Sequence, residues 1–485
     1  MQFDLLSKFR IQTFETDIVN IIKKFTGLLS LILLLFLFDS VLSYAQGRVS
    51  YRELASRNQQ QNIYFDFFTL PGDSENSVQF VTTFRVDYNF LPFKKTDRPE
   101  RNRQFFSPLG LSMEVFKALE KRKPDDRIEV EGLESVSRAA WRDTAFAESY
   151  EQTQSNKSFI SGKMNVELAP GLYNYMLQLN PGEDTRERTS RARQIEVNSY
   201  GEQKTGDVLL IESVNTVDGE EHLKLMNFAK NVYYGKDFYA LVHLPGSESN
   251  SSYNLSINKL EINKDDTTRL QQIYSSQISG NDMRNNVKPA IRENGNEISL
   301  VLKKQGSAHN YALVKIPNST FPNSIYRIAV TQEGQARPAA QSVFRSLWIE
   351  MPTSLLNLEV ATNMLEFIVS KDEIKRIKSG SQAEREQKFR EFWESKDPTP
   401  NTEYNELMAE YYRRIDYAYE HFTTINNIGY ESDQGEIYIK YGPPNNIDRK
   451  FPTGEPAVEI WTYDNRQFVF RATSGFGDFR LVSRQ

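Results

Sequence analysis

The first half of the sequence alternates between hydrophobic and polar positions. Across residues 78–88, every second side chain is aromatic or β-branched, as at Phe80, Phe84 and Val86. A period of two is typical of a β-strand with one buried face. Turn-forming residues separate further segments of this kind. We expect strands over residues 78–88, 158–168, 172–179, 208–213, 238–244, 297–303, 311–316 and 325–330.

Two of these strands begin with a similar local pattern. A turn that contains proline leads into a tyrosine, in Ala169-Pro170-Gly171-Leu172-Tyr173 and again in Phe321-Pro322-Asn323-Ser324-Ile325-Tyr326. Such an entry into a late strand is common in immunoglobulin-like sandwiches, and the strand spacing favours the same architecture. We therefore predict two tandem immunoglobulin-like β-sandwiches, over residues 62–200 and 205–350.

The pattern changes to a helical period at residue 351. Hydrophobic positions recur every three or four residues over 355–368, 384–393 and 402–427, which predicts amphipathic helices. Asp397-Pro398 follows the second helix, since proline disfavours helical geometry in the residue before it. Gly429 is placed to form the C-terminal cap of the third.

The period returns to two after Gly435. We expect strands over residues 437–441, 458–463 and 467–471, with a hairpin loop between the last two. Residues 351–485 thus form a predicted α+β domain of helices followed by a small antiparallel sheet. A length of 485 residues fits three domains at about 150 residues each. The predicted fold class is a mostly β, multi-domain protein.

The N-terminal residues have the features of a secretory signal. Lys23 and Lys24 precede an apolar run over 25–38, and small residues follow at Ser43 and Ala45. We predict a signal peptide over residues 1–45, cleaved after Ala45, and then a polar linker over 46–61. The alternative is a retained signal anchor. No second segment has the length of about 20 apolar residues that spans a bilayer, so we expect no membrane span in the mature chain.

Composition excludes several classes of function. The net charge of −5 argues against a protein that holds nucleic acid. The absence of cysteine excludes disulfides, thiolate metal sites, a cysteine nucleophile and a lipid anchor on an N-terminal cysteine. The four histidines lack metal-ligand spacing, and the sequence has no glycine-rich phosphate loop and no hydrolase or metalloprotease motif. We therefore expect no cofactor and no metal.

The last hundred residues carry several separated elements in a fixed order. These are Phe392-Trp393, Asp397-Pro398-Thr399-Pro400, Asn405-Glu406, Gly429-Tyr430-Glu431-Ser432-Asp433-Gln434-Gly435, Tyr438-Ile439, Tyr441-Gly442-Pro443-Pro444 and Trp461. Together they resemble the GWxTD domain, a module of bacterial envelope proteins without an established biochemical role. This sequence departs from the family pattern at three positions. Tyr430 replaces the tryptophan, Ser432 the threonine and Gln434 the usual arginine.

The motif residues have a structural interpretation. Tyr430 can pack where the long helix meets the sheet, and Ser432 and Asp433 can accept backbone N–H groups in the turn before a strand. Gly442-Pro443-Pro444 would end that strand, because proline cannot donate to a ladder. Trp461 alternates towards the helical side of the sheet, so we predict that Trp461 and Tyr430 are core residues.

A catalytic interpretation stays open beside the structural one. Glu403, Glu406 and Glu410 share one face of the predicted helix, with Asp397 and Asp433 flanking it. Such a carboxylate cluster could bind a divalent cation or serve as acid and base. Alternatively, Glu410 forms ordinary ion pairs with the arginines three and four positions later.

The resemblance implies an exported protein of a Gram-negative, Bacteroidota-like bacterium, in the periplasm, at the outer membrane or outside the cell. We expect a secreted, non-enzymatic protein that binds or scaffolds an envelope protein partner through its sandwiches and its C-terminal domain. One alternative is an envelope enzyme of the hydrolase type that uses the C-terminal carboxylates. Another is a carbohydrate-binding role for the sandwiches.

Overall fold

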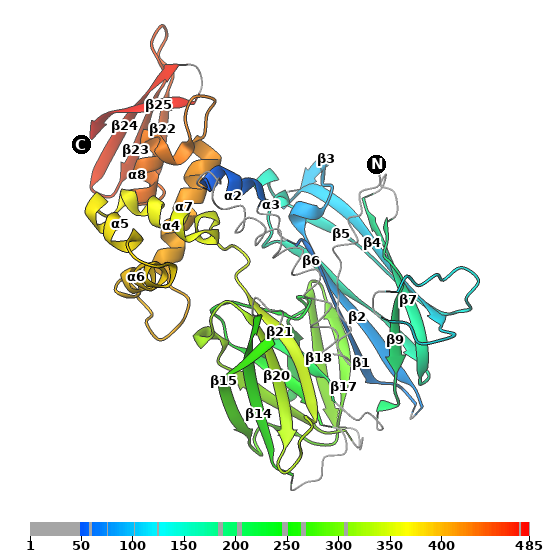
Figure 1. The fold of residues 1–485 in the computed structure, drawn as a ribbon. Helices are drawn as coiled ribbons and strands as arrows, with labels where there is room; N and C mark the ends of the chain where they lie inside the picture. The colour runs from blue at the N-terminus through cyan, green and yellow to red at the C-terminus, as the bar shows by residue number, and fades with distance from the viewer. Residues whose placement is uncertain are drawn as a thin grey trace. The chain divides into compact units, whose positions relative to one another are not determined.

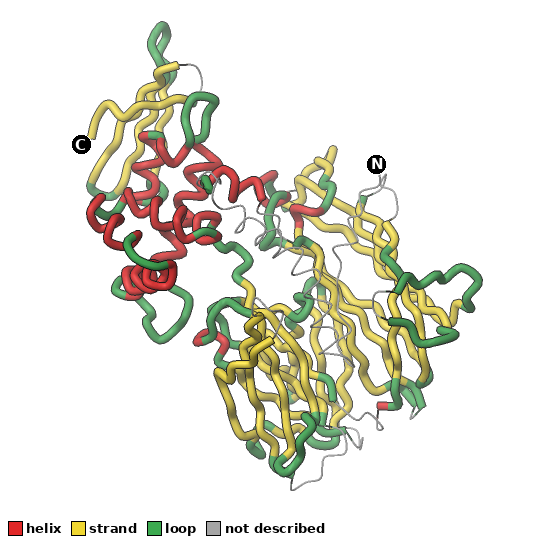
Figure 2. Tube along the Cα trace, in the orientation of Figure 1, coloured by secondary structure: helices red, strands yellow, loops and turns green. Residues whose placement is uncertain are grey.

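The chain forms two compact units in a computed structural model (Figures 1 and 2). The first unit contains the described residues between 61 and 347, and the second contains residues 49–57 together with those after 347. The predicted signal peptide, residues 1–45, lies outside the described residues. The structure describes residues 49–57, 61–74, 76–100, 102–123, 126–182, 188–200, 206–244, 251–262, 268–304, 309–474 and 477–484.

The first unit begins with a sandwich of two sheets. One sheet has the order β1-β2-β6, and the other has the order β3-β4-β7-β8, with β5 on β4 and β9 on β7. Phe67 and Phe80 of the first sheet pack against Tyr175 of the second, with ring centroids 5.1 and 5.2 Å apart. The strands are β1 Ile63–Pro71, β2 Val78–Asp87, β3 Lys94–Glu100, β4 Arg103–Lys117, β5 Ser135–Ala147, β6 Phe159–Leu168, β7 Gly171–Pro181, β8 Arg188–Thr189 and β9 Arg193–Val197.

A second sandwich follows in the same unit. Its sheets have the orders β16-β19-β13-β10-β11-β18-β17 and β12-β21-β20-β14-β15. Phe238 and Phe344 meet across them, with centroids 5.2 Å apart. The strands are β10 Val208–Val217, β11 Glu220–Leu225, β12 Asn231–Tyr233, β13 Phe238–His243, β14 Tyr253–Ile262, β15 Thr268–Ile278, β16 Met283–Arg284, β17 Val287–Asn294, β18 Glu297–Lys304, β19 Tyr311–Ile316, β20 Ile325–Gln332 and β21 Ala340–Leu347.

The two sandwiches share one topology. The path β1-β2-β6 corresponds to β10-β13-β19, and β5-β4-β7-β9 corresponds to β15-β14-β20-β21. This is the arrangement of an immunoglobulin-like sandwich, and β11, β17 and β18 extend one sheet of the second copy. The predicted fold class is confirmed. One continuous cluster of buried residues runs through both sandwiches, so they form a single unit.

A tyrosine corner marks the same strand in each sandwich. The Tyr173 hydroxyl donates to the carbonyl of Ala169, 2.9 Å away, near the start of β7. The Tyr326 hydroxyl donates to the carbonyl of Pro322 near the start of β20. A tyrosine that bonds back to the chain a few residues upstream holds the turn between two sheets of such sandwiches. The repeated pattern in the sequence therefore encodes a repeated corner.

The second unit contains helices followed by a small antiparallel sheet, as predicted. The sheet has the order β22-β23-β24-β25. One hydrophobic cluster lies among the helices, and a smaller one lies under the sheet. The elements are α2 Tyr51–Arg57, η4 Thr353–Leu356, α4 Leu358–Asn363, η5 Met364–Phe367, α5 Lys371–Lys378, α6 Gln382–Glu394, α7 Glu406–Phe422, η6 Gly429–Glu431, α8 Asp433–Tyr441, β22 Asn446–Lys450, β23 Val458–Tyr463, β24 Arg466–Ser474 and β25 Asp478–Arg484.

Three local predictions for this unit are wrong. Residues 437–441, predicted as a strand, belong to helix α8. Ile439 packs into the helical cluster and Ile437 into the sheet cluster, so burial on two sides imitates the alternation of a strand. The helix predicted over 355–368 is a short α-helix between two 3-10 helices. The predicted polar linker contains helix α2, whose Tyr51 is buried in the helical cluster.

Candidate functional site

Ser432 organises the turn between η6 and α8. Its side-chain oxygen accepts from the backbone N–H of Gly435, 3.0 Å away, and caps the N-terminus of α8. The same hydroxyl donates to the carbonyl of Gly429 at 2.6 Å. One buried side chain therefore satisfies groups on both sides of the turn, which is the role that a serine or threonine favours at this position.

Two glycines let this turn pack against the long helix. A Cβ on Gly429 would lie 1.9 Å from the carbonyl oxygen of Ala418 in α7, and a Cβ on Gly435 would lie 2.0 Å from the carbonyl oxygen of Gly429. The predicted capping role of Gly429 is wrong, because α7 ends at Phe422 and Thr423 is its cap residue. Glycine is required at position 429 because the backbone of the turn lies against the backbone of α7.

Asp433 joins α8 to the last strand. Its Oδ2 accepts from the backbone N–H of Leu481 in β25, at 2.7 Å, and the guanidinium of Arg480 lies 3.7 Å from its Oδ1. The sequence predicts an acceptor within the local turn, whereas the observed donor is 48 positions away. The Asp433 carboxylate thus joins β25 to α8, and it does not bond a backbone N–H of its own turn.

A buried carboxylate lies beneath the sheet. Glu459 Oε2 accepts from the side-chain amide of Gln434 at 2.8 Å and from the indole N–H of Trp461 at 3.1 Å. Its Oε1 lies 2.6 Å from Nε of Arg449 in β22. Gln434 stands where the GWxTD pattern has arginine, and the guanidinium that pairs with Glu459 here comes from β22. Trp461 itself is 1% exposed, as the core prediction requires.

Asn405 connects the two longest helices. Its Oδ1 accepts from the backbone N–H of Met408 and caps α7, while its Nδ2 donates to the carbonyl of Trp393 in α6, at 2.8 and 2.9 Å. In the loop between the helices, Asp397-Pro398 begins a turn in which Asp397 Oδ1 accepts from the N–H of Thr399 at 2.8 Å. The Thr399 hydroxyl then donates to Glu406 at 2.5 Å.

Gly442-Pro443-Pro444 ends a helix and not the predicted strand. Gly442 has φ 78° and follows α8 directly, a conformation that favours glycine at this position. The hydroxyl of Tyr463 donates to the Gly442 carbonyl at 2.9 Å and holds the exit from the helix against the sheet. Proline then prevents further helix.

Of the carboxylates proposed as a catalytic cluster, Asp397 and Glu406 share Thr399 as a partner, whereas Glu410 and Asp433 bond other groups. Glu410 pairs with Arg413 and with Arg414, the latter at 2.8 Å, as the ion-pair alternative predicts. Glu406 bonds Thr399, and Asp433 bonds β25. Among the residues that the structure describes, no three histidine, aspartate or glutamate side chains converge as a metal site would require.

Tyr430 lies in an aromatic cluster that the sequence analysis missed. The predicted position at the junction of helix and sheet is wrong, because Tyr430 packs among the helices. Its ring meets that of Tyr51 in α2, with centroids 5.4 Å apart, and Tyr51 also meets Tyr419 at 4.8 Å. The Tyr51 hydroxyl donates to Asp416 at 2.6 Å. Tyr51 is hard to find from sequence because its neighbours are polar.

Asp416 lies on α7, where it is half-buried and contacts α2 and η4. Its second oxygen accepts from the backbone N–H of Thr353 at 2.9 Å. Burial raises the pKa of Asp416 to about 6, against the bonds from Tyr51 and Thr353 that favour the ionised form. The folded unit therefore binds a proton more tightly here than the unfolded chain does.

Replacing Asp416 by asparagine is expected to flatten the pH dependence of stability. With a raised pKa, the contribution of Asp416 is fully favourable below about pH 4 and is lost as pH rises through about 6, an effect of at most about 3 kcal/mol. Denaturant unfolding between pH 4 and 7, followed by tryptophan fluorescence, measures it. Glu431→Gln, at an exposed position, should keep the wild-type slope. An unchanged slope in Asp416→Asn would contradict the prediction.

A row of aromatic rings lies on another part of α7 and α8. The ring of Tyr417 stacks between His421 and Tyr438, with centroid distances of 3.8 and 4.2 Å and interplanar angles of 9° and 11°. Tyr441 follows one turn along α8, and the guanidinium of Arg466 lies 4.8 Å from its ring centroid. Tyr417 and Tyr441 are 36% and 39% exposed. We call His421, Tyr417, Tyr438 and Tyr441 the aromatic row.

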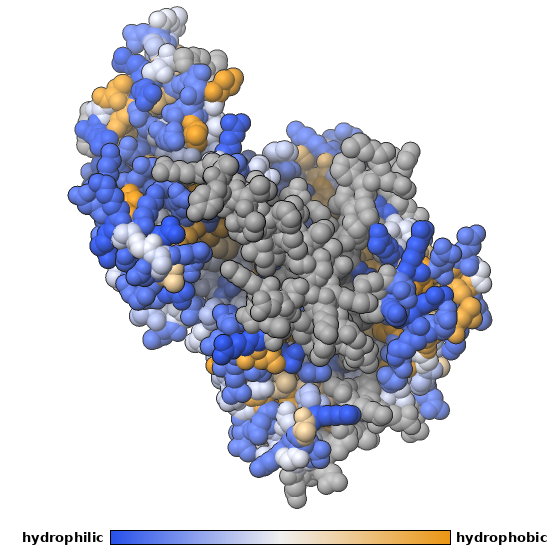
Figure 3. All heavy atoms as spheres, in the orientation of Figure 1, coloured by the Kyte–Doolittle hydropathy of each residue, from blue (hydrophilic) through white to orange (hydrophobic). Residues whose placement is uncertain are grey.

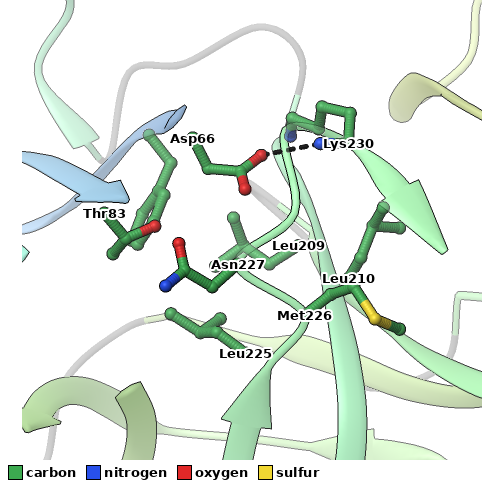
Figure 4. A pocket seen from close by; sticks show the side chains of 9 residues that line it. Asp66, Thr83, Leu209, Leu210, Leu225, Met226, Asn227 and Lys230 are labelled. Carbon is green, nitrogen blue, oxygen red and sulfur yellow. Dashed lines mark hydrogen bonds between the residues drawn. The ribbon is translucent and has the colours of Figure 1, made fainter. Parts of the chain in front are cut away.

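The first unit contains a small, mostly apolar pocket between its sandwiches (Figure 4). The half-buried Asp66 carboxylate accepts from the backbone N–H groups of Ala229 and Lys230, at 2.8 and 2.9 Å. Asn227, Ala229 and Lys230 all have positive φ, so this carboxylate holds a strained loop of the second sandwich against β1 of the first. The pocket thus belongs to the junction of the two sandwiches.

The fold and the motif geometry define a two-unit protein in which β-sandwiches precede a helical domain with a terminal sheet. Residues 348–478 match the family model of the GWxTD domain, so the chain is a GWxTD domain-containing protein. The comparison with curated proteins gives no match. Among the described helices, none combines the length and apolar character needed to cross a bilayer.

Proposed function

We propose that this protein is a secreted, non-enzymatic component of the bacterial envelope that binds a protein partner through its GWxTD domain. The observation that carries the proposal is the aromatic row. Tyrosine, tryptophan and arginine are enriched among the residues that dominate the energy of protein interfaces. The row presents two half-exposed tyrosines beside the exposed guanidinium of Arg413 and the ring-bound Arg466.

The rings of the row are held in place before any partner binds. Tyr417 is fixed by stacking on both faces, and the Glu410 carboxylate holds Arg414 alongside α7. A rigid aromatic surface loses little conformational entropy on binding. The face of the GWxTD unit in Figure 3 shows hydrophobic atoms scattered among hydrophilic ones. This supports a contact based on a few aromatic side chains rather than on a broad apolar patch.

The local contacts of the motif support a non-enzymatic role. Ser432 and Asn405 serve as helix caps, Asp433 binds a backbone N–H of β25, and Glu459 is enclosed by Gln434 and Trp461. Each side chain has a task in joining helices to the sheet. A general acid or base would instead have to reach the proton of a substrate.

Crosslinking in intact cells, followed by capture of the tagged full-length chain, tests this function. We expect Tyr417→Ser and Tyr441→Ser to lose a captured partner protein, because they remove the exposed rings. Tyr150→Ser is the matched control, since this tyrosine is 64% exposed in the first unit. Asp433→Asn and Glu406→Gln keep an acceptor oxygen but cannot exchange a proton, so we expect wild-type capture and a wild-type host phenotype.

Two outcomes would overturn the proposal. If Asp433→Asn or Glu406→Gln accumulates normally but behaves like a deletion, the envelope-enzyme alternative takes its place. If the row variants retain every crosslinked protein and lose binding to a cell-wall glycan instead, the carbohydrate alternative applies. Circular dichroism of each purified variant shows whether its fold is intact.

A further inference from the structure

Helix α2 occupies a groove of the GWxTD domain that is built around one tyrosine. The Tyr51 ring contacts Tyr419 and Tyr430, with centroids 4.8 and 5.4 Å away, and its hydroxyl donates to the half-buried Asp416 at 2.6 Å. Tyr51 is only 3% exposed. The half-buried Leu54 and Ala55 pack on the same cluster, so the helix presents tyrosine, leucine and alanine on one side.

This helix is a separate piece of the domain. Tyr51 and Asp416 are 365 positions apart in the sequence, and among the described residues the other elements of the second unit lie after residue 347. Helix α2 has seven residues, too few for a stable helix in water without tertiary contacts. Over residues 51–56, Tyr51 is the one fully buried side chain, so insertion of this ring determines whether the helix is ordered.

The groove has the chemistry to select tyrosine. Asp416 is half-buried, and its two oxygens accept one bond from the Tyr51 hydroxyl and one from the Thr353 N–H. A phenylalanine in place of Tyr51 would fill the aromatic space but leave one half-buried oxygen without its donor, which is costly. Polar groups that lose a partner in this way give stronger discrimination than apolar pockets do.

We propose that this groove is a peptide-recognition site of the GWxTD domain, and that its resident ligand is the segment of residues 49–57 of the same chain. The site recognises a short helix that carries leucine three positions and alanine four positions after a tyrosine. The segment docks and leaves as a unit while the rest of the domain stays folded. The site is independent of the aromatic row, which uses other side chains of α7.

Binding of the segment in trans tests the proposal on the full-length mature chain. The Tyr51→Ala chain has a weakened resident ligand. The probe is a fluorescein-labelled synthetic peptide of residues 49–60. We expect fluorescence anisotropy to show saturable binding to the Tyr51→Ala chain, and at least about tenfold weaker binding to the wild-type chain, whose groove is occupied. A peptide with Tyr51→Phe should bind about tenfold more weakly than the wild-type peptide.

Asp416 supplies the second arm of the experiment. In a chain that carries both Tyr51→Ala and Asp416→Asn, the preference for the tyrosine peptide over the phenylalanine peptide should shrink, because asparagine leaves one acceptor oxygen for the two donors that Asp416 serves. If the Tyr51→Ala chain does not accumulate, Tyr51→Phe, which keeps the packing, serves in its place. Absence of saturable binding to a folded variant chain, or equal binding of both peptides to it, would overturn the proposal.

Discussion

Trp461→Ala is expected to destabilise the GWxTD unit by about 3–5 kcal/mol, the usual range for removing a large buried aromatic side chain. Trp461 is 1% exposed and packs against Phe422 and Phe470, with centroids 5.6 and 4.9 Å away. Its indole N–H also donates to the buried Glu459 at 3.1 Å. The substitution therefore creates a cavity under the sheet and removes a donor from an enclosed carboxylate.

Denaturant unfolding of the full-length chain measures this loss. Three of the four tryptophans lie in the second unit, and Trp348 and Trp393 still report on it after Trp461 is removed. Phe451→Ala is the control, because Phe451 is 67% exposed and should change stability by less than about 0.5 kcal/mol. If both variants unfold at the wild-type midpoint, Trp461 does not belong to the core.

Gly429→Ala is expected to cost at least about 3 kcal/mol, at or above the upper end of the range for overpacking. The added Cβ would lie 1.9 Å from the carbonyl oxygen of Ala418 and 2.7 Å from the backbone nitrogen of Thr423. Both atoms belong to the main chain at the end of α7, so no side-chain rotation relieves the clash. The turn with Tyr430 must move away from the helix.

Gly454→Ala is the matched control for this prediction. Gly454 lies in the same unit with φ 80°, and nothing is within 4 Å of a Cβ built on it. It should cost only about 1–2 kcal/mol, the usual penalty for a left-handed residue with a side chain. Both variants are compared by the same fluorescence-detected unfolding. Equal losses would mean that close approach to α7 does not explain Gly429.

The pattern of hydrophobic residues and turns in the sequence was sufficient to predict the sandwiches. The alternation over residues 78–88 and the two turns that lead into Tyr173 and Tyr326 predict strands and a repeated corner, because these features depend on a few neighbouring residues. The helical period of α7 is a local signal of the same kind. The motif elements that define the GWxTD domain can also be recognised directly in the amino-acid sequence.

Contacts between residues far apart in the sequence decided the structure of α8 and the roles of Asp433 and Gly429. The alternating isoleucines of α8 suggest a strand, but Ser432 caps a helix whose two sides face different cores. Asp433 meets its donor in β25, and Gly429 is needed because α7 passes next to it.

The sequence by itself determined the β-sandwiches, the order of helices and sheet, and the family of the C-terminal domain, since local periodicity and short motifs carry that information. Only the tertiary structure decided that Tyr51 completes the aromatic cluster of Tyr430, because the pairing joins segments separated by 365 positions. No local pattern encodes a partner at that distance. The pairing depends on the Asp416 carboxylate, which reaches the Tyr51 hydroxyl only when the chain folds.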